Sequence, residues 1–291
     1  MSAPGGRLRR TVTQVALGAA ALAGALGLVA PAARAEVPAG SVTRTSGTVT
    51  ATLSWQAGEF AGTSPRLAIS RGGTLVDNFD LGTVCRGCEL FPDGAEDRGS
   101  FSLLTVADLD SDHEPEVLFE TLSGGAHCCQ TTRIYRYLGN GGYSRPLSVP
   151  WGNAGYVLKD LGHDGRQELV GGDDAFAYAF SSYAASVFPP KIVRYAVGRN
   201  GLPAVKNVTR SYPAPVRTQA KALLKAIREA RPSADGTYEI QGPIAAYVAD
   251  EYLLGRGRVG RAELARVRAR RLVAPGFGRS LLSFLHTHRY R

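Results

Sequence analysis

The segment Val106–Glu120 reads V-A-D-L-D-S-D-H-E-P-E-V-L-F-E, an acidic run that leads directly into an apolar one. Five carboxylates fall within nine residues, and they are Asp108, Asp110, Asp112, Glu114 and Glu116. Carboxylates at this density repel one another unless a cation lies among them. Ca²⁺ suits such a group because it accepts six to eight oxygen ligands in a loose geometry. The segment therefore predicts a calcium site, with a solvated acidic turn as the alternative.

The apolar end of this segment, residues 117–119, is β-branched and aromatic and predicts a strand. An EF-hand needs Gly at position 6 of its loop and Glu at position 12. Counting from Asp108, these positions hold His113 and Phe119, so the sequence excludes an EF-hand. The pattern instead predicts a metal loop that feeds a strand.

A second copy of the loop follows 52 residues later, within residues 157–170. Its carboxylates at positions 1, 5 and 9 are Asp160, Asp164 and Glu168. Gly162 stands at position 3 and offers no side-chain oxygen, so this copy is either a weaker metal site or a metal-free turn. The segments that follow the two loops, residues 133–143 and 191–201, also resemble each other.

Both loops resemble the calcium loop of the FG-GAP or VCBS repeat, the integrin-type β-propeller blade, whose pattern is roughly D-x-D-x-D-G-x-x-D. The resemblance covers about residues 101–203. It implies side-chain ligands at Asp108, Asp110, Asp112 and Glu116, and a backbone carbonyl ligand at Glu114. His113 replaces the family's Gly, so a residue with a side chain would have to adopt the left-handed conformation. The family implies binding, often adhesion or ligand display, but it is also found attached to enzymes.

Residues 36–203 as a whole are predicted to form a β domain. Residues 49–55 alternate small polar and apolar side chains, and residues 66–70 and 74–76 flank a Gly-Gly turn typical of a hairpin. An internal period of about 50 residues indicates propeller blades or another stacked β array. Two clear repeats and an N-terminal sheet are too few for a closed propeller, which needs about four blades. We therefore expect a partial β-propeller-like or β-sandwich-like repeat domain.

Residues 204–291 are predicted to form a basic helical domain, so the fold class is mainly β with a C-terminal helical tail (α+β). The apolar periodicity predicts four helices, at residues 216–231, 243–254, 259–272 and 277–286. Charge supports the boundary, because residues 36–203 carry 19 acidic and 13 basic side chains, whereas the tail carries 6 and 17. The arginine-rich third helix is typical of an anion binder or of a solvated helix. It lacks interleaved aromatic residues, which disfavours nucleic acid as the partner.

Residues 1–35 have the features of a signal peptide. Arg7, Arg9 and Arg10 precede an apolar run at residues 15–30, and Ala33-Arg34-Ala35 matches a cleavage site. We expect no transmembrane segment after cleavage and a secreted or extracytoplasmic location. The Arg9-Arg10 pair leaves open whether a bacterial twin-arginine or Sec pathway exports the chain.

The four cysteines are predicted to form disulfides in an oxidising compartment, and they are Cys85, Cys88, Cys128 and Cys129. Neighbouring residues of a strand face opposite ways, so Cys128 and Cys129 do not easily reach the same partner, and the pairing stays open. Zinc held by these cysteines or His127, and a nucleophilic or redox pair, are the alternatives.

Together these patterns predict an exported, non-catalytic binding or scaffold protein with a structural calcium-binding loop. A cell-envelope polymer or an extracellular protein is the expected partner. The chain has no G-x-S-x-G, H-E-x-x-H or Walker sequence. A secreted hydrolase built on the β domain is the alternative. The chain has many Asp and Glu residues, and a pair of carboxylates is what glycoside hydrolysis requires.

Overall fold

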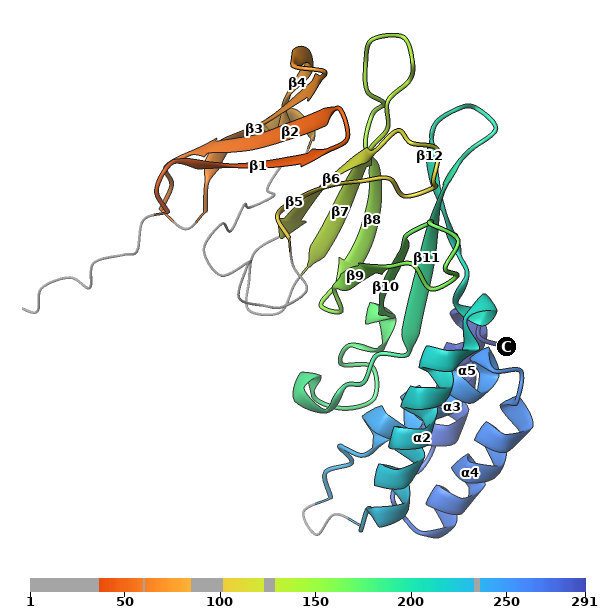
Figure 1. Ribbon diagram of the computed structural model, residues 1–291. Coiled ribbons are helices and arrows are strands. Elements are labelled where there is room, and N and C mark those ends of the chain that lie inside the picture. The colour runs from red at the N-terminus through yellow and green to blue at the C-terminus, as the bar shows by residue number, and fades with distance from the viewer. Residues whose placement is uncertain (1–36, 60, 85–101, 123–128, 233–235) are drawn as a thin grey trace, which may run out of the picture. The chain divides into compact units, whose positions relative to one another are not determined.

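The computed structural model describes residues 37–59, 61–84, 102–122, 129–232 and 236–291. The chain divides into two compact units, Met1–Arg34 and Ala35–Arg291, and all described residues belong to the second. The predicted signal peptide therefore lies outside the described residues. In the described part, three four-stranded antiparallel sheets are followed by four C-terminal helices (Figure 1). The predicted fold class, mainly β with a helical tail, is confirmed.

Each sheet is a meander, because consecutive strands of the chain pair with one another. The strands of the first sheet are β1 (Gly40–Ser46), β2 (Val49–Gln56), β3 (Thr63–Arg71) and β4 (Thr74–Asp80), with the short helix α1 (Leu81–Val84) after them. The strands of the second sheet are β5 (Leu104–Ala107), β6 (Glu116–Leu122), β7 (Gln130–Tyr135) and β8 (Leu147–Gly152). The strands of the third sheet are β9 (Tyr156–Lys159), β10 (Glu168–Gly172), β11 (Pro190–Val197) and β12 (Pro203–Asn207). The predicted strand at residues 49–55 and the predicted hairpin are β2 and the β3–β4 pair.

The middle sheet is buried on both faces, which explains the apolar run after the acidic segment. Val117 and Phe119 on β6 pack into a core shared with the first sheet, where Leu53 is fully buried. Leu118, between them, packs into a second core with the third sheet, where Val193 lies. A strand that is covered on both faces needs no polar face, which explains why residues 117–119 are all apolar.

The predicted helices of the tail are present with bounds close to those expected. They are α2 (Pro213–Glu229), α3 (Gln241–Leu253), α4 (Gly257–Ala269) and α5 (Phe277–Thr287). Three one-turn 3-10 helices precede them, η1 (Asp174–Phe176), η2 (Tyr183–Ala185) and η3 (Thr209–Ser211). The four helices share a core with Phe176. Strand β12 crosses residue 203, so the third sheet extends past the predicted boundary and the helices begin at Pro213.

One carboxyl group in this helical core has no neutralising partner. Asp250 on α3 is 0% exposed, and neither of its carboxyl oxygens has a hydrogen-bond partner in the described part of the chain. Burial, with the charge of Glu251 as a smaller cause, raises the pKa of Asp250 to about 8. The group is therefore mostly protonated at neutral pH when the chain is folded.

Candidate metal centre

The first acidic loop connects β5 to β6, and its own carboxylates hold its shape. Asp108 accepts hydrogen bonds from the backbone N–H groups of Asp112 (3.3 Å) and His113 (2.9 Å). Glu116 accepts one from the N–H of Leu109 (3.0 Å), across the base of the loop. These bonds close the loop into a tight turn.

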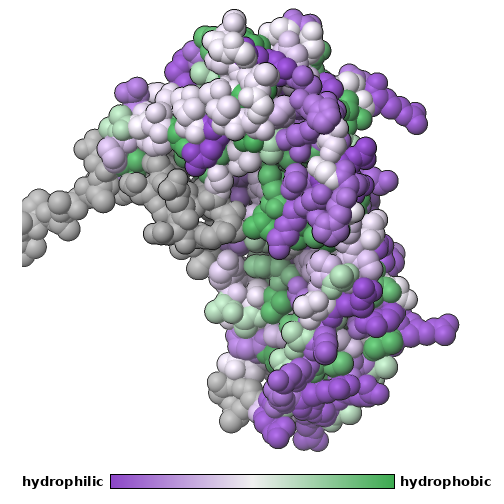
Figure 2. Space-filling view, in the orientation of Figure 1, coloured by the Kyte–Doolittle hydropathy of each residue, from purple (hydrophilic) through white to green (hydrophobic). Residues whose placement is uncertain are grey.

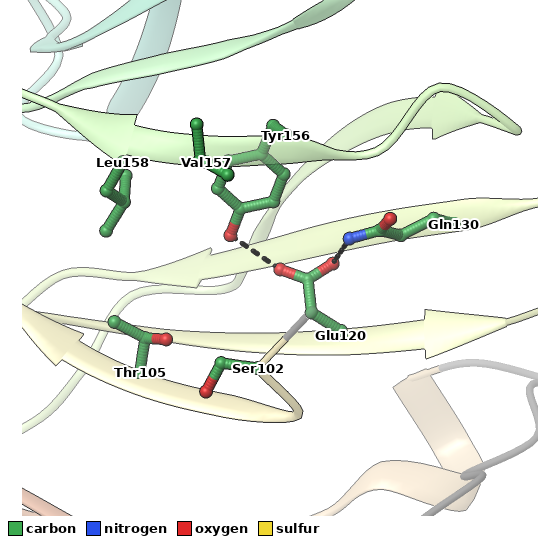
Figure 3. A pocket seen from close by; sticks show the side chains of 7 residues that line it. All are labelled: Ser102, Thr105, Glu120, Gln130, Tyr156, Val157 and Leu158. Carbon is green, nitrogen blue, oxygen red and sulfur yellow. Dashed lines mark hydrogen bonds between the residues drawn. The ribbon is translucent and has the colours of Figure 1, made fainter. Parts of the chain in front are cut away.

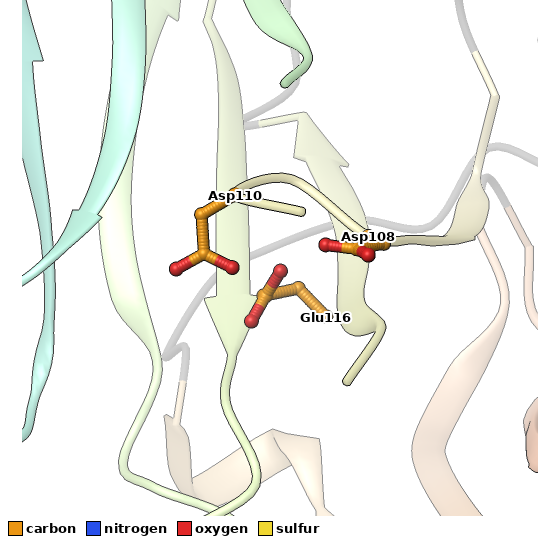
Figure 4. Close-up of side chains that lie close together, drawn as sticks. All are labelled: Asp108, Asp110 and Glu116. Atoms are coloured by element: carbon orange, nitrogen blue, oxygen red, sulfur yellow. The ribbon is translucent and has the colours of Figure 1, made fainter. Parts of the chain in front are cut away.

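Three of the predicted ligands come together inside this turn (Figure 4). Asp108, Asp110 and Glu116 each place one carboxylate oxygen within 4.8 Å of the others. Glu116 is 1% exposed, and Oδ1 of Asp110 is buried without a hydrogen-bond partner. A buried carboxylate oxygen without a partner costs free energy, so this geometry fits a cation better than an empty turn. These three residues could therefore hold a hard metal ion.

The electrostatics of the loop point the same way. Burial raises the pKa of Asp110, and the charges of Asp112 and Asp108 raise it further. Burial likewise raises the pKa of Glu116 to about 8, and the charges of Asp110 and Asp112 add to this. Each shift records a carboxylate that lacks enough positive charge nearby. A bound divalent cation would favour the ionised form of all three groups.

The other two acidic residues of the loop point elsewhere. The side chain of Glu114 forms an ion pair with Arg71 at the end of β3, which ties the loop to the first sheet. Oδ1 of Asp112 accepts the N–H of Glu114 (2.8 Å), and its Oδ2 lies 4.0 Å from Nη2 of Arg136. The predicted roles of Asp112 as a side-chain ligand and of Glu114 as a carbonyl ligand stay predictions.

The second loop connects β9 to β10 and repeats the hydrogen bonds of the first. Asp160 accepts from the N–H groups of Asp164 (3.2 Å) and Gly165 (3.0 Å), as Asp108 does from its own neighbours. Glu168 accepts from the N–H of Leu161 (3.0 Å), as Glu116 does in the first loop. The two loops also touch, because the N–H of Gln167 donates to the carbonyl of Leu109 (3.2 Å). The sequence repeat is thus a repeat in structure.

An arginine that the sequence reasoning missed occupies the inside of the second loop. Arg194 on β11 pairs across the sheet with Glu168. Its Nη2 lies 2.7 Å from Oε1 of Glu168 and 4.0 Å from Oδ2 of Asp164, and Tyr212 donates a hydrogen bond to the same Glu168 oxygen (3.0 Å). The similarity of residues 133–143 to residues 191–201 was the signal, because it aligns Arg136 with Arg194. In the first loop, Nη2 of Arg136 lies 4.0 Å from Oδ2 of Asp112, and its charge opposes the rise in the pKa of Asp110.

Both loops need a left-handed residue at position 6, and only the second has glycine there. His113 has φ of 68° and Gly165 has φ of 82°, as the sequence comparison predicts. We expect His113→Gly to stabilise the chain by about 1 kcal/mol, because glycine adopts this conformation without the strain of a Cβ atom. Urea unfolding of the two proteins measures the change.

The matched control for this prediction is Gly165→Ala. A Cβ atom at Gly165 would lie 2.7 Å from Oγ of Ser111, so this substitution adds both backbone strain and a clash. We expect it to destabilise the chain, in contrast to His113→Gly. If His113→Gly and Gly165→Ala both raised or both lowered the free energy of unfolding, this account of the loops would be contradicted.

The arginines of residues 256–271 are largely used within the chain. Four of the seven have described partners there, which are Glu251 for Arg256, the Tyr252 hydroxyl for Arg261, Glu263 for Arg266, and backbone carbonyls at the end of α2 for Arg270. Hydrophilic side chains cover most of the surface over α2 and α4 on the face shown in Figure 2. These contacts favour a solvated helix over a dedicated anion-binding surface.

Among the described residues, Cys129 is disulfide-bonded. The other candidates, Cys85, Cys88 and Cys128, lie outside the described residues, as does His127. The pairing of the cysteines therefore stays a prediction.

Comparison with known proteins places the chain near two relatives. It is 35% identical over 167 residues to a probable thylakoid lumen protein of Synechocystis sp., a match that covers 56% of this chain and 47% of that protein. It is 34% identical over 127 residues to an uncharacterized protein of Sinorhizobium fredii, covering 43% of this chain and 18% of that protein. The chain thus spans about half of the first relative and less of the second.

No protein-family model and no solved structure matches the chain. In the described part, no helix is both long enough and apolar enough to cross a membrane.

Proposed function

We propose that this chain is an exported, non-catalytic binding or scaffold protein whose first acidic loop holds a structural calcium ion. The observation that carries the proposal is the group formed by Asp108, Asp110 and Glu116, with its partnerless buried oxygen. Calcium ligands lie about 2.3–2.6 Å from the ion, so they fall within about 5 Å of one another. The three carboxylate oxygens satisfy this condition. The ion would neutralise the turn and fix β5 and β6, the strands that it joins.

A second buried group supports the same site. The hydroxyl of Tyr195 on β11 is buried beside Glu116 without a well-formed hydrogen bond, and burial together with the charges of Glu116 and Asp110 raises its pKa. Water completes most calcium coordination shells, and a bound water is both donor and acceptor. Such a water would also satisfy the Tyr195 hydroxyl.

In the second loop, we infer that Arg194 takes the place of the metal. Its guanidinium already contacts Glu168, which is 0% exposed, and lies near Asp164. A divalent ion at this position would have to displace a paired charge, and it would find no side-chain oxygen at Gly162. The predicted ligands Asp160, Asp164 and Glu168 would then serve to hold the turn around an internal cation.

The partial-propeller interpretation belongs to this proposal as well. All three sheets are four-stranded meanders, and both acidic loops join the first strand of a sheet to the second. This repeated placement supports blades of the FG-GAP or VCBS type. The partial-propeller interpretation is also supported by the packing of neighbouring sheets, which share hydrophobic cores.

An extracytoplasmic location is part of the proposal. It rests on the signal-like residues 1–35 and on the relative described as a probable thylakoid lumen protein. The disulfide at Cys129 is consistent with an oxidising compartment. An extracellular protein or an envelope polymer remains the proposed partner.

Calcium titration of thermal and urea unfolding tests the proposed site. At free calcium ten times the Kd, the free energy of unfolding should rise by about 1.4 kcal/mol relative to chelator. Asp110→Asn should abolish this gain, yet stabilise the calcium-free chain, because it removes one of the repelling charges. Glu229→Gln, an exposed change on α2, serves as the control with an unchanged calcium response. The site would be refuted if calcium did not stabilise the unsubstituted chain, or if it stabilised the Asp110→Asn variant by the same amount.

A further inference from the structure

A cavity that contains one buried carboxylate lies between the middle and third sheets, and it shares no lining residue with the acidic loops (Figure 3). Its volume is about 180 Å³, and its walls come from β5, β6, β7 and β9 together with Ser102, which lies two residues before β5. The lining residues are Ser102, Thr105, Glu120, Gln130, Tyr156, Val157 and Leu158. In Figure 3 the carboxylate of Glu120 points toward the side chains of Gln130 and Tyr156.

Glu120 is the only charged side chain among these lining residues, and its position is fixed from three sides. It is 2% exposed. The Tyr156 hydroxyl donates to Oε1 (2.7 Å), and Gln130 Nε2 (3.1 Å) and Thr132 Oγ1 (3.0 Å) donate to Oε2. A carboxylate held by so many donors is orientated before any ligand arrives.

The directions of these hydrogen bonds leave the cavity with an acceptor. The indole of Trp151 can only donate, and it donates to Oγ1 of Thr132 (3.0 Å), so the hydroxyl proton of Thr132 is directed to Glu120. The amide nitrogen of Gln130 is also engaged with Glu120, whereas its carbonyl oxygen points away from the carboxylate (Figure 3). Oε1 of Glu120 has one donor and therefore keeps room for a second.

The charge and the walls of the cavity together select a class of ligand. Burial raises the pKa of Glu120 to about 7, although its three donors lower it, so its charge lacks a counterion. Leu158 and the ring of Tyr156 point to the same side of β9 and supply an apolar wall beside this carboxylate (Figure 3). A group that is cationic at one end and apolar along its stem matches both features.

We propose that this cavity binds an alkylammonium group, with the ammonium on Glu120 and the alkyl stem along Leu158 and the ring of Tyr156. A primary ammonium presents three donors at one compact point. A guanidinium needs both oxygens of a carboxylate for a bidentate contact, and here Oε2 already accepts two hydrogen bonds. Calcium needs six or more oxygens, far more than one carboxylate and a few neutral oxygens offer at this site.

The chemistry of an alkylammonium group is shared by free amines and by lysine side chains of proteins. Binding is therefore tested with a free amine and with a lysine-containing peptide. Binding to the full chain in calcium-containing buffer is measured by NMR titration and calorimetry. The probes are butylammonium, its neutral analogue 1-butanol, and a short peptide that carries one central lysine in free or Nζ-acetylated form.

We expect butylammonium to bind with a Kd of about 1 mM, and 1-butanol to bind at least about tenfold more weakly, because it lacks the charge-assisted hydrogen bond. Glu120→Gln keeps the size of the side chain and should weaken butylammonium about tenfold or more. Leu158→Trp keeps the carboxylate but fills the cavity, so it should also abolish binding. Glu229→Gln, the exposed control, should leave binding unchanged.

The comparison of probes then identifies the source. Tighter binding of the lysine peptide than of butylammonium, lost on acetylation, assigns the site to a protein partner. The reverse order assigns it to a free amine, and either order supports the cavity as an alkylammonium site. Equal binding of butylammonium and 1-butanol, or butylammonium binding that survives both Glu120→Gln and Leu158→Trp, overturns the proposal. Absence of binding to the unsubstituted chain overturns it as well.

Discussion

Replacing Arg194 with Met is expected to lower the free energy of unfolding by about 3–5 kcal/mol, because it leaves a buried carboxylate without its counterion. Glu168 is 0% exposed, and Arg194 contacts it through both Nε (2.8 Å) and Nη2 (2.7 Å). The methionine fills a similar volume along the stem, so the loss reports the charge rather than a cavity. Urea unfolding at pH 7 measures the difference.

Arg136→Met is the matched control, since Arg136 holds the equivalent place beside the first loop. Its nearest loop carboxylate, on Asp112, lies 4.0 Å away and is partly exposed, so we expect a cost of about 1 kcal/mol or less from the lost charge pair. Adding Glu168→Met to Arg194→Met should recover part of the loss, because it removes the unpaired buried charge, although the Leu161 N–H and the Tyr212 hydroxyl then lose their acceptor. Equal costs for Arg194→Met and Arg136→Met would show that no guanidinium is needed inside the second loop.

Asp250→Ala is expected to make the chain less sensitive to pH. The pKa of Asp250 is raised from its ordinary 3.8 to about 8, so the folded chain keeps a proton that the unfolded chain releases. The corresponding stability is present below pH 4 and is lost as the pH rises through about 8. Alanine has no proton to release, so the variant does not show this loss. The free energy of unfolding of the variant minus that of the unsubstituted chain should therefore increase by about 3–5 kcal/mol between pH 4 and pH 9.

Urea unfolding of both proteins at several pH values gives this difference directly. Other buried carboxyls, such as Glu120, titrate in both proteins and cancel in the comparison. The exposed control Glu229→Gln should differ from the unsubstituted chain by a free energy of unfolding that stays constant in the upper part of the range from pH 4 to pH 9. A flat difference for Asp250→Ala as well would mean that Asp250 is ionised in the folded chain with a partner or water beside it.

Much of the fold follows from local patterns in the sequence. The alternation in residues 49–55 and the Gly72-Gly73 turn identify β2 and the β3–β4 hairpin, and apolar periodicity identifies α2 to α5. The first sheet has no acidic loop, because a short turn at Gly47 joins β1 to β2. The sequence therefore shows two repeats and an N-terminal sheet, where the structure has three similar meanders.

The candidate site was only partly accessible from sequence. Alternate acidic residues identify Asp108 and Asp110, and the pattern places Glu116 with them, because all three lie in one loop. The partner of Glu168 comes from β11, 26 residues later, and its role depends on strand register. The Glu120 cavity depends on how two sheets pack, so no local signal indicates it. Groups that meet only through tertiary packing escape a reading of local patterns.

Strand β6 belongs to two cores, and this has a consequence for how the β region unfolds. Each outer sheet is covered on one side by the middle sheet, whereas the middle sheet depends on both neighbours. In such a linear array, stability is transmitted only between nearest neighbours, and either outer sheet can open while the remaining pair stays folded. Loss of the middle sheet, in contrast, exposes both cores at once. An ion bound between β5 and β6 would therefore slow the opening of the whole β region, although it touches a single loop.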